Sequence, residues 1–453
     1  MEMKDSSQVL KNILLVGAGK SSDVLISYLI ELCQDEKWKL KIVAKALPKN
    51  HDADNAIVQY EACDVLKDDR LGVWVESSDI VISMLPASMH LDIAEKCLFY
   101  GKHFLSASYV SDKMKSMHDD VKSKGLVFLN ECGLDPGLDH MSAMSVLDEI
   151  KGKGGIVNGF ESFAGGLVAP EFDDNPWNYK LTWNPRNVVL AGQGGVAKFK
   201  QNDTYKFIPY QQLFRRTERI HITGYGKFEG YANRDSLKYQ TLYNLSGIST
   251  LFRGTLRRAG FCKAWNKLVL LGMTDDSYSI DISANMTYRD FTNLFLNYHS
   301  SNAVEVKFQK TLAIAQDDFD LIEKMEYLGL FSDKLIKMDK GTPAEILQKL
   351  LEEKWKLQQG DRDMIVMIHK FDFTLGGDRK KTQSSLVVEG ESQARTAMAK
   401  TVGLPLGIAA KLILTEKVNK KGVIIPTEKE LYVPILKELS EKFGIRFNEE
   451  EMA

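Results

Sequence analysis

Short apolar runs alternate with amphipathic segments along the first part of the chain. Six of these runs have the length and composition of strands, at 12–16, 40–44, 57–62, 79–84, 103–106 and 126–129. Helical spacing occurs between or after them, at about 23–32, 89–100, 111–124 and 141–150. Strands that alternate with helices in this way predict an α/β domain with a doubly wound parallel sheet.

The pattern changes after about residue 155. Partial alternation at 155–164 and alternation over most of 217–231 predict a mixed or antiparallel sheet with one buried face. From 262 to 360 the spacing is mainly helical. Within this stretch Thr342-Pro343-Ala344-Glu345 is a capping box that opens a helix to about residue 357.

The C-terminal part contains a hairpin and two apolar helices. The runs at 363–373 and 382–389 flank Gly376-Gly377-Asp378, a pattern typical of a hairpin, which is expected to rejoin the second sheet. Helices at 394–402 and 406–414 are too apolar to be exposed, so we expect them to pack against the first domain. We therefore predict a discontinuous dinucleotide-binding domain at 1–138 and 391–453, an α+β substrate domain at 139–261 and 361–390, and a small helical insert at 262–360.

The composition is that of a soluble globular protein. Hydrophobic residues make up 44% and charged residues 26% of the 453 positions, and the net charge is -2. This charge gives no reason to expect a nucleic-acid partner. The basic cluster at 252–258 is too short for a nucleic-acid surface and suits a small polyanionic substrate instead.

Neither the cysteines nor the histidines have metal-ligand spacing. The five cysteines are scattered, which fits a reducing cytoplasm rather than disulfides or zinc. The eight histidines form no HxH or HExxH pattern. The N-terminus has no apolar signal core, and no apolar run approaches the length of a membrane span. We therefore expect a cytoplasmic protein with neither a metal nor a membrane partner.

A dinucleotide fingerprint follows the first predicted strand. Gly17-Ala18-Gly19-Lys20-Ser21-Ser22 has Ser22 where the third glycine usually stands. The first glycine allows the tight turn, the second lets the backbone approach a pyrophosphate, and the helix N-terminus faces that anion. After the second strand no acid precedes Asp52, and Lys45 favours NADP over NAD, although a lysine at a strand end is usually only solvated.

The segment 130–140 carries more chemical specification than an ordinary strand-to-helix loop needs. It holds two glycines, a proline, two aspartates and a histidine between an apolar strand and a helix. Polar residues also follow other strands, at Asp64, Ser108 and Tyr109. Each has an ordinary alternative as a helix cap, a turn former or a packing residue. Together they indicate a ligand cleft at the carboxyl edge of the sheet.

Several motifs run in order along nearly the whole chain. They are ECGLDPGLDHM at 131–141, GGLVAPE at 165–171, DNP at 174–176, YKLTWNPR at 179–186, NRDS at 233–236, RGTLR at 253–257, RDMIV at 362–366 and AMAKTVGLP at 397–405. This series resembles the glutamate-forming saccharopine dehydrogenases (saccharopine reductases). The resemblance implies a Rossmann domain completed by C-terminal elements, a substrate domain and a helical insert.

The resemblance also implies an activity. It is the oxidation of saccharopine, with water, to L-glutamate and 2-aminoadipate 6-semialdehyde in lysine metabolism, or the reverse, with NAD or NADP. The substrate is then a small molecule, and the sequence leaves open whether the chain forms a homodimer.

Matching positions imply a cofactor site and a substrate site. The cofactor would be held by Gly17, Gly19, Lys20, Ser21, Ser22, Lys45, Asp64, Val65, Ser83, Ser106, Ala107, Leu134, Asp135, Pro136 and Asn184. Saccharopine would meet Ala107, Ser108, Asp135, Arg234, Thr255, Leu256 and Arg257. Arginine forks bind carboxylates bidentately, so Arg234 and Arg257 are the expected anchors for a tricarboxylate. The alternative for either arginine is a surface ion pair.

A general base is expected near the nicotinamide. The secondary amine must be neutral to release hydride, and water must attack the resulting imine. Asp135 is the candidate base and Tyr109 its proton partner; the alternatives are a turn aspartate and a packing tyrosine. His140 is expected at the start of a helix, as a packing histidine.

The chain departs from the family pattern on the substrate side. Phe163 and Ala164 stand where the family commonly has tyrosine and cysteine, and Tyr231-Ala232-Asn233 replaces a glycine-proline-asparagine turn. Two alternatives therefore remain: an oxidoreductase for another carboxylated secondary amine, such as a carboxyalkyl polyamine, and a non-catalytic dinucleotide-binding sensor. Retention of Asp135, Arg234 and Arg257 argues against the sensor, which needs no tricarboxylate anchors.

Overall fold

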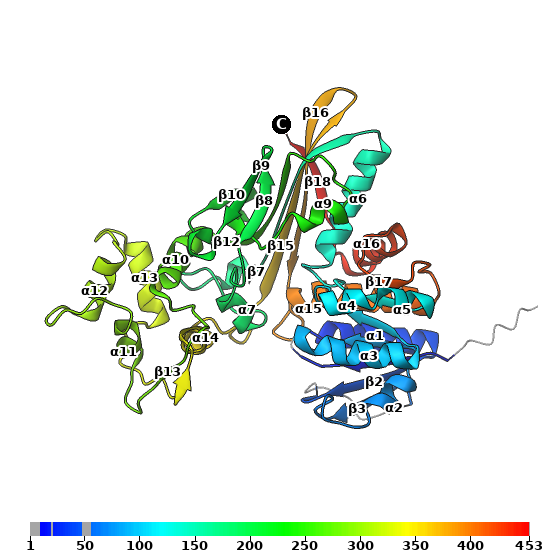
Figure 1. Cartoon of the computed structure of the whole chain (residues 1–453), viewed down its shortest axis with the longest axis horizontal. Coiled ribbons are helices and arrows are strands. Elements are labelled where there is room, and N and C mark those ends of the chain that lie inside the picture. Colours follow the sequence, from blue (N-terminus) through cyan, green and yellow to red (C-terminus); the bar gives the residue numbers. More distant parts are fainter. Residues whose placement is uncertain (1–9, 20, 48–55, 453) are drawn as a thin grey trace, which may run out of the picture. The chain divides into compact units, whose positions relative to one another are not determined.

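The computed structural model describes residues 10–19, 21–47 and 56–452, which form two compact units (Figure 1). The first unit comprises Met1–Ile156 and Leu386–Glu449, and the second comprises Val157–Ser385 and Glu450–Ala453. The chain thus leaves the first unit after α6 (Leu138–Gly152) and returns to it near its C-terminus.

The first unit is built on a seven-stranded parallel sheet with the order β17-β6-β5-β4-β1-β2-β3. Its strands are β1 (Asn12–Val16), β2 (Lys39–Ala44), β3 (Val58–Ala62), β4 (Ile80–Ser83), β5 (His103–Ser106), β6 (Val127–Leu129) and β17 (Gly422–Ile424). The strand order reverses at β1, between β2 and β4, and such a switch point is where open α/β sheets bind ligands. The predicted doubly wound sheet is confirmed, with one more strand, β17, than the six expected.

The helices of the first unit follow the predicted α/β alternation. They are α1 (Asp23–Glu36), α2 (Leu71–Glu76), α3 (His90–Tyr100), α4 (Asp112–Ser116), α5 (His118–Ser123), α6, α15 (Ala397–Leu414) and α16 (Lys429–Phe443), with the 3-10 turn η1 (Ala87–Met89). The single helix predicted at 111–124 is instead two short helices that meet at Met117.

Helix α15 corrects the prediction of two separate C-terminal helices. It begins at Ala397 after the cap Thr396, runs without a break through Pro405, and is buried along most of its length. Its packing against α1 is close, because a Cβ on Gly407 would lie 2.4 Å from the ring of Tyr28. Pro405 has no amide hydrogen to donate to the helix, and the helix nevertheless continues past it to Leu414.

Helix α15 is also long and apolar enough to cross a membrane, contrary to the expectation that no run reaches that length. However, 78% of this 18-residue window is buried inside the protein. A buried core helix of a globular protein meets the same length and composition criteria.

The second unit is built on a nine-stranded mixed sheet with the order β10-β11-β12-β7-β15-β16-β18, to which β8 and β9 attach at β12. Its strands are β7 (Ile156–Val168), β8 (Ala197–Gln201), β9 (Thr204–Ile208), β10 (Thr217–Ile222), β11 (Gly226–Ala232), β12 (Thr250–Arg258), β15 (Asp363–Leu375), β16 (Asp378–Glu389) and β18 (Asn448–Met452). Strand β12 is antiparallel to β11 and parallel to β7, which confirms the predicted mixed sheet.

The predicted helical insert remains part of the second unit. The unit contains η2 (Pro170–Phe172), α7 (Pro185–Val189), α8 (Tyr210–Leu213), α9 (Lys238–Leu242), α10 (Phe261–Leu271), α11 (Tyr288–Asn293), α12 (Val304–Thr311), α13 (Phe319–Leu328), α14 (Pro343–Lys354) and the short strands β13 (Ile280–Asp281) and β14 (Lys340–Gly341). The capping box at Thr342 and Glu345 is present, and α14 ends at Lys354. Buried aromatic rings of Trp177, Trp265 and Trp355 join this part to the rest of the unit.

Candidate active site

The turn after β1 has the geometry of a pyrophosphate cradle. Gly17 has a φ of 97°, and a Cβ there would lie 3.0 Å from the carbonyl carbon of Met84, so only glycine fits without strain. A Cβ on Gly19 would meet nothing within 4 Å, which leaves open space over the backbone just before α1. The hydroxyl of Ser22 is buried and has no hydrogen-bond partner among the described residues. This turn therefore fits an anion at the N-terminus of α1.

Two further predicted cofactor residues, Lys20 and Ser21, belong to the same turn in the sequence. Lys20 lies outside the described residues, and Ser21 is half-buried in the turn that follows it. Their contacts with a cofactor stay predictions.

The ends of β2 and β3 carry a small cluster of charges. The ammonium of Lys45 lies 3.8 Å and that of Lys67 lies 3.9 Å from a carboxylate oxygen of Asp64, and both lysines are exposed. The neighbouring Val65 is buried. Together the three charged side chains carry one net positive charge, and exposed pairs of this kind exchange partners at little cost. The cluster fits the 2′-phosphate that distinguishes NADP from NAD.

Strands β4, β5 and β6 bring their polar exit residues together. The Ser106 hydroxyl donates a hydrogen bond to Oδ1 of Asn130 at 3.0 Å. Ser83 and Ser108 are joined through the ring of His90, whose Nδ1 is 2.9 Å from the Ser83 hydroxyl and whose Nε2 is 2.8 Å from the Ser108 hydroxyl. The sequence reasoning did not single out His90, and its only signal is a histidine seven residues after Ser83 at the start of a helix.

The loop from β6 to α6 is held in one tight shape. The amide of Gly133 donates to the carbonyl of Pro136 at 3.0 Å, and the amide of Leu138 donates to the carbonyl of Gly133 at 2.9 Å. Gly137 has a φ of 149°, and a Cβ there would overlap the backbone of Gly133. Backbone bonds from Glu131 and Cys132 to the Ser108 and Ser106 carbonyls attach this loop to the exit of β5.

This loop places Asp135 beside Tyr109. The Tyr109 hydroxyl donates to Oδ1 of Asp135 at 3.1 Å, and Asp135 is half-buried while Tyr109 is exposed. Leu134 and Pro136, on either side of Asp135, are buried. The pair predicted to handle protons is therefore in hydrogen-bonding contact, and its catalytic role stays a prediction.

Glu131 and His140 form a buried hydrogen-bonded pair within this segment. Nε2 of the buried His140 is 2.8 Å from one Glu131 carboxylate oxygen, and the other oxygen accepts a hydrogen bond from the Val110 amide at 3.0 Å. His140 lies in the first turn of α6, as expected, but its ring has a polar partner in addition to its packing.

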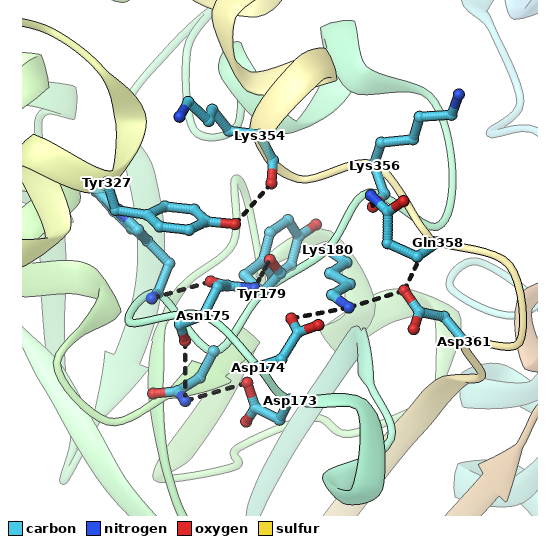
Figure 2. Close-up of polar contacts among 12 residues, drawn as sticks. Asp173, Asp174, Asn175, Tyr179, Lys180, Tyr327, Lys354, Lys356, Gln358 and Asp361 are labelled. Carbon is cyan, nitrogen blue, oxygen red and sulfur yellow. Dashed lines mark hydrogen bonds and ion pairs between the residues drawn. The ribbon is translucent and has the colours of Figure 1, made fainter.

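In the second unit, the YKLTWNPR motif is tied to the chain that precedes β15. Figure 2 shows the ammonium of Lys180 between two carboxylates, 2.8 Å from Asp361 and 2.9 Å from Asp174. Lys180 and Asp361 are both buried, and Oδ2 of Asp361 also accepts from the Gln358 amide. Burial disfavours the ammonium charge, but the hydrogen bonds with Asp361 and Asp174 outweigh it, so the pKa of Lys180 is raised.

Asn184 follows in the same motif, where its side chain caps α7 by accepting a hydrogen bond from the Arg186 amide at 3.0 Å. The cofactor contact expected of Asn184 stays a prediction.

Arg257 is buried among aromatic rings of the second unit. Its guanidinium carbon lies 5.0 Å from the ring centre of Tyr179 and 5.3 Å from that of Phe261, and only 3% of the residue is exposed. One nitrogen donates to the Leu256 carbonyl at 2.8 Å. Among the described residues, neither its buried Nε nor the buried Tyr179 hydroxyl has a hydrogen-bond partner, and no carboxylate forms an ion pair with this guanidinium.

The two expected carboxylate anchors do not lie together. Arg257 pairs in register with Glu229 on β11, whereas Arg234 lies five residues beyond Glu229 and is exposed, with a φ of 45°. Strand β11 ends at Ala232, which pairs with Gly254, whereas Arg257 lies three residues further along β12. The two arginines therefore lie toward different ends of this strand pair. Thr255 lies between them on β12 and is half-buried.

The departures from the family pattern have different surroundings. Phe163 is fully buried against Phe252 and packs under Gly230 and Gly254, where a Cβ would lie within 2.7 Å of its ring. Its missing hydroxyl therefore concerns the core of the sheet. Ala164 pairs in register with Thr255, a predicted substrate residue, so the missing thiol concerns the expected substrate side.

No three histidine, cysteine, aspartate or glutamate side chains of the described ranges are grouped as metal ligands would be.

Comparisons with known proteins agree with this architecture. The model of the saccharopine dehydrogenase NADP binding domain matches residues 13–129, and that of the saccharopine dehydrogenase C-terminal domain matches residues 133–445. Saccharopine dehydrogenase (NADP(+), L-glutamate-forming) of Schizosaccharomyces pombe is 31% identical over 97% of this chain and 98% of its own length. The alpha-aminoadipic semialdehyde synthase of Rattus norvegicus is 32% identical, and the match covers 47% of that longer protein.

The solved structures give the same result. The apo saccharopine dehydrogenase (L-Glu forming) from Saccharomyces cerevisiae has a TM-score of 0.86 and 29% identity, with 98% of this chain and 100% of that chain covered. A homospermidine synthase from Legionella pneumophila has a TM-score of 0.55 at 11% identity, which shows a shared fold alone. The resemblance drawn from the sequence motifs is confirmed, and the chain belongs to the saccharopine dehydrogenase family.

Proposed function

We propose that this protein is an NADP-dependent, glutamate-forming saccharopine dehydrogenase of lysine metabolism. Family membership over nearly the whole chain supports the reaction. The observation that carries the proposal is the carboxyl edge of the first sheet, where an open glycine turn and the hydrogen-bonded Tyr109–Asp135 pair belong to one compact unit. A cytoplasmic location fits the scattered cysteines and is part of the same proposal.

The proposed reaction converts saccharopine, water and NADP(+) to L-glutamate, 2-aminoadipate 6-semialdehyde, NADPH and a proton. The turn after β1 would hold the pyrophosphate of NADP(+), and the bound cofactor would supply the hydride acceptor for the carbon next to the secondary amine. Asp135 accepts the ammonium proton of saccharopine and releases it to solvent as the proton of the overall equation. It then accepts a proton from the water that attacks the imine carbon and returns that proton to the nitrogen that leaves with glutamate. The Tyr109 hydroxyl orients the Asp135 carboxylate through the bond to Oδ1.

Two of the three carboxylates of saccharopine are assigned to the second unit. The Arg257 Nε and the Tyr179 hydroxyl, which are buried without partners, are donors that a carboxylate would satisfy. A buried guanidinium without a carboxylate is costly, which favours an anionic ligand beside it. Because Arg234 lies beyond the end of β11 whereas Arg257 pairs with Glu229 inside that strand, we assign the two arginines to different carboxylates of the tricarboxylate.

The proposal is tested by following nicotinamide reduction when purified protein meets saccharopine with NADP(+), then with NAD(+), at mildly alkaline pH. We expect absorbance to grow with NADP(+) and glutamate to form in equal amount. No growth of absorbance with either cofactor, despite cofactor binding shown by calorimetry, would contradict the proposal.

In that case a second substrate class becomes the leading candidate, namely another carboxylated secondary amine such as a carboxyalkyl polyamine. The position of Ala164 beside Thr255 favours it, because the change from cysteine lies on the expected substrate side. The same absorbance assay with that amine distinguishes the two substrates.

The cofactor preference gives a separate prediction. Lys45→Asp should lower the ratio of kcat/KM for NADP(+) to that for NAD(+) by about 10-fold or more, because a charge-assisted contact with the 2′-phosphate is lost. Lys96→Asp is the control, since Lys96 is an exposed lysine of α3 in the same unit and does not belong to this charge cluster. An equal change in both variants, or none, would show that Lys45 is merely solvated.

A further inference from the structure

One buried imidazole joins two serines that lie at the ends of neighbouring strands. Ser83 ends β4, Ser108 follows β5, and His90 opens α3 between them in sequence. The ring nitrogens of His90 are 2.9 Å and 2.8 Å from the two hydroxyl oxygens, and the residue is 5% exposed. Both hydrogen-bonding atoms of the ring are therefore used by these two hydroxyls.

The ring is neutral at physiological pH. Burial lowers the pKa of His90 to about 4, since a charged ring would be poorly solvated there. A neutral imidazole has one N–H donor and one acceptor nitrogen, so one serine must donate to the ring and the other must accept from it.

Only two arrangements of the hydrogens meet the requirement that one ring nitrogen donates and the other accepts. In the first, the Ser83 hydroxyl donates to Nδ1 and Nε2–H donates to the Ser108 oxygen, which leaves the Ser108 hydrogen for a ligand. In the second, the directions are reversed, and Ser108 offers a ligand only lone pairs. Ser108 is half-buried, whereas Ser83 is buried. A carboxylate is an acceptor only, so an anionic substrate selects the first arrangement.

We propose that His90 is a positioning residue that directs the hydroxyl hydrogen of Ser108 toward a carboxylate of the substrate, with Ser83 holding the ring in the required tautomer. This inference rests on the proposed function, because it requires a carboxylated substrate at Ser108. In this proposal His90 itself touches neither substrate nor cofactor and acts through Ser108.

The test compares saccharopine and cofactor kinetics in a set of variants of the full chain. His90→Phe keeps the ring shape without the hydrogen bonds and should raise the saccharopine KM by about 10-fold, with the NADP(+) KM changed less than about 2-fold. Ser108→Ala should have a similar effect. Because both changes remove the same contact, the double variant should be no worse than Ser108→Ala alone.

Two further variants separate positioning from stability. His90→Gln retains a donor and an acceptor and should recover most of the lost affinity. His103→Phe is the control, because His103 is a half-buried histidine at the other end of β5 whose Nδ1 accepts a hydrogen bond from the Val127 amide. It should leave the saccharopine KM unchanged. If His90→Phe does not fold, the contrast between His90→Gln and Ser108→Ala decides the matter, since equal losses in both would overturn the proposal.

Other outcomes distinguish failure of the positioning role of His90 from failure of the proposed function. Additive effects of His90→Phe and Ser108→Ala, or an equal rise in both KM values, would assign His90 a purely structural role. An unchanged saccharopine KM in an active His90→Phe enzyme would overturn the positioning role and leave the proposed function intact. An inactive wild type would overturn the proposed function, and the inference with it.

Discussion

Asp135→Asn should lower kcat for saccharopine oxidation by about 100-fold to 10,000-fold, the range expected for loss of a positioned general base. The amide has nearly the same shape as the carboxylate and can still accept the hydrogen bond from Tyr109, so the loop should keep its structure. It cannot accept a proton from the amine or the water. Initial rates at saturating saccharopine and NADP(+) measure the effect.

Two controls separate the loss of a general base from general damage to the protein or to cofactor binding. Asp148→Asn changes a carboxylate of α6 that bonds to the Tyr432 hydroxyl, and it should leave kcat unchanged. Calorimetry should show that Asp135→Asn still binds NADP(+) as the wild type does. A kcat within about 3-fold of the wild-type value would exclude Asp135 as the base and make it a turn aspartate.

Lys180→Met should lower the free energy of unfolding by about 3–5 kcal/mol, because it leaves the buried Asp361 carboxylate without its cation. The loss should be visible in urea unfolding followed by tryptophan fluorescence, since Trp177, Trp265 and Trp355 lie in the same unit. In the double variant Lys180→Met with Asp361→Leu the loss should be smaller, because both charges are then absent.

The matched control is Lys334→Met, which breaks the exposed pair of Lys334 and Glu353 in the same unit. Its unfolding free energy should change by less than about 1 kcal/mol. Equal losses in Lys334→Met and Lys180→Met would contradict a special role for the buried pair. The Lys180 pair also connects the backbone beside Tyr179 to the chain entering β15, so a weaker saccharopine affinity is expected together with the lost stability.

The parts of the fold that sequence could predict are those set by local pattern. Apolar runs of strand length located β1 to β6, and the glycine spacing after β1 located the anion turn, because both signals lie within a few residues. The glycines and the proline at 130–140, which a tight backbone requires, indicated the loop there. The helix cap at Thr342 was equally local.

The parts that escaped prediction depend on partners distant in sequence. Lys180 and Asp361 are 181 residues apart, and no local pattern pairs them. His90 is 18 residues from Ser108, and its role follows only from the sheet that aligns β4 with β5. Likewise, the sequence predicts Arg257 as a carboxylate anchor, with a surface ion pair as the alternative, but it does not show that the side chain is buried among aromatic rings.

The discontinuity of the first unit has a consequence for synthesis on the ribosome. Residues 157–385, nearly all of the second unit, emerge as one continuous stretch, so that unit can close while the rest of the chain is still being translated. The first sheet lacks its edge strand β17, and α1 lacks its cover α15, until residues 397–424 have emerged. The nascent nucleotide-binding half thus spends most of translation with apolar surface uncovered, and chaperone binding is expected to concentrate there.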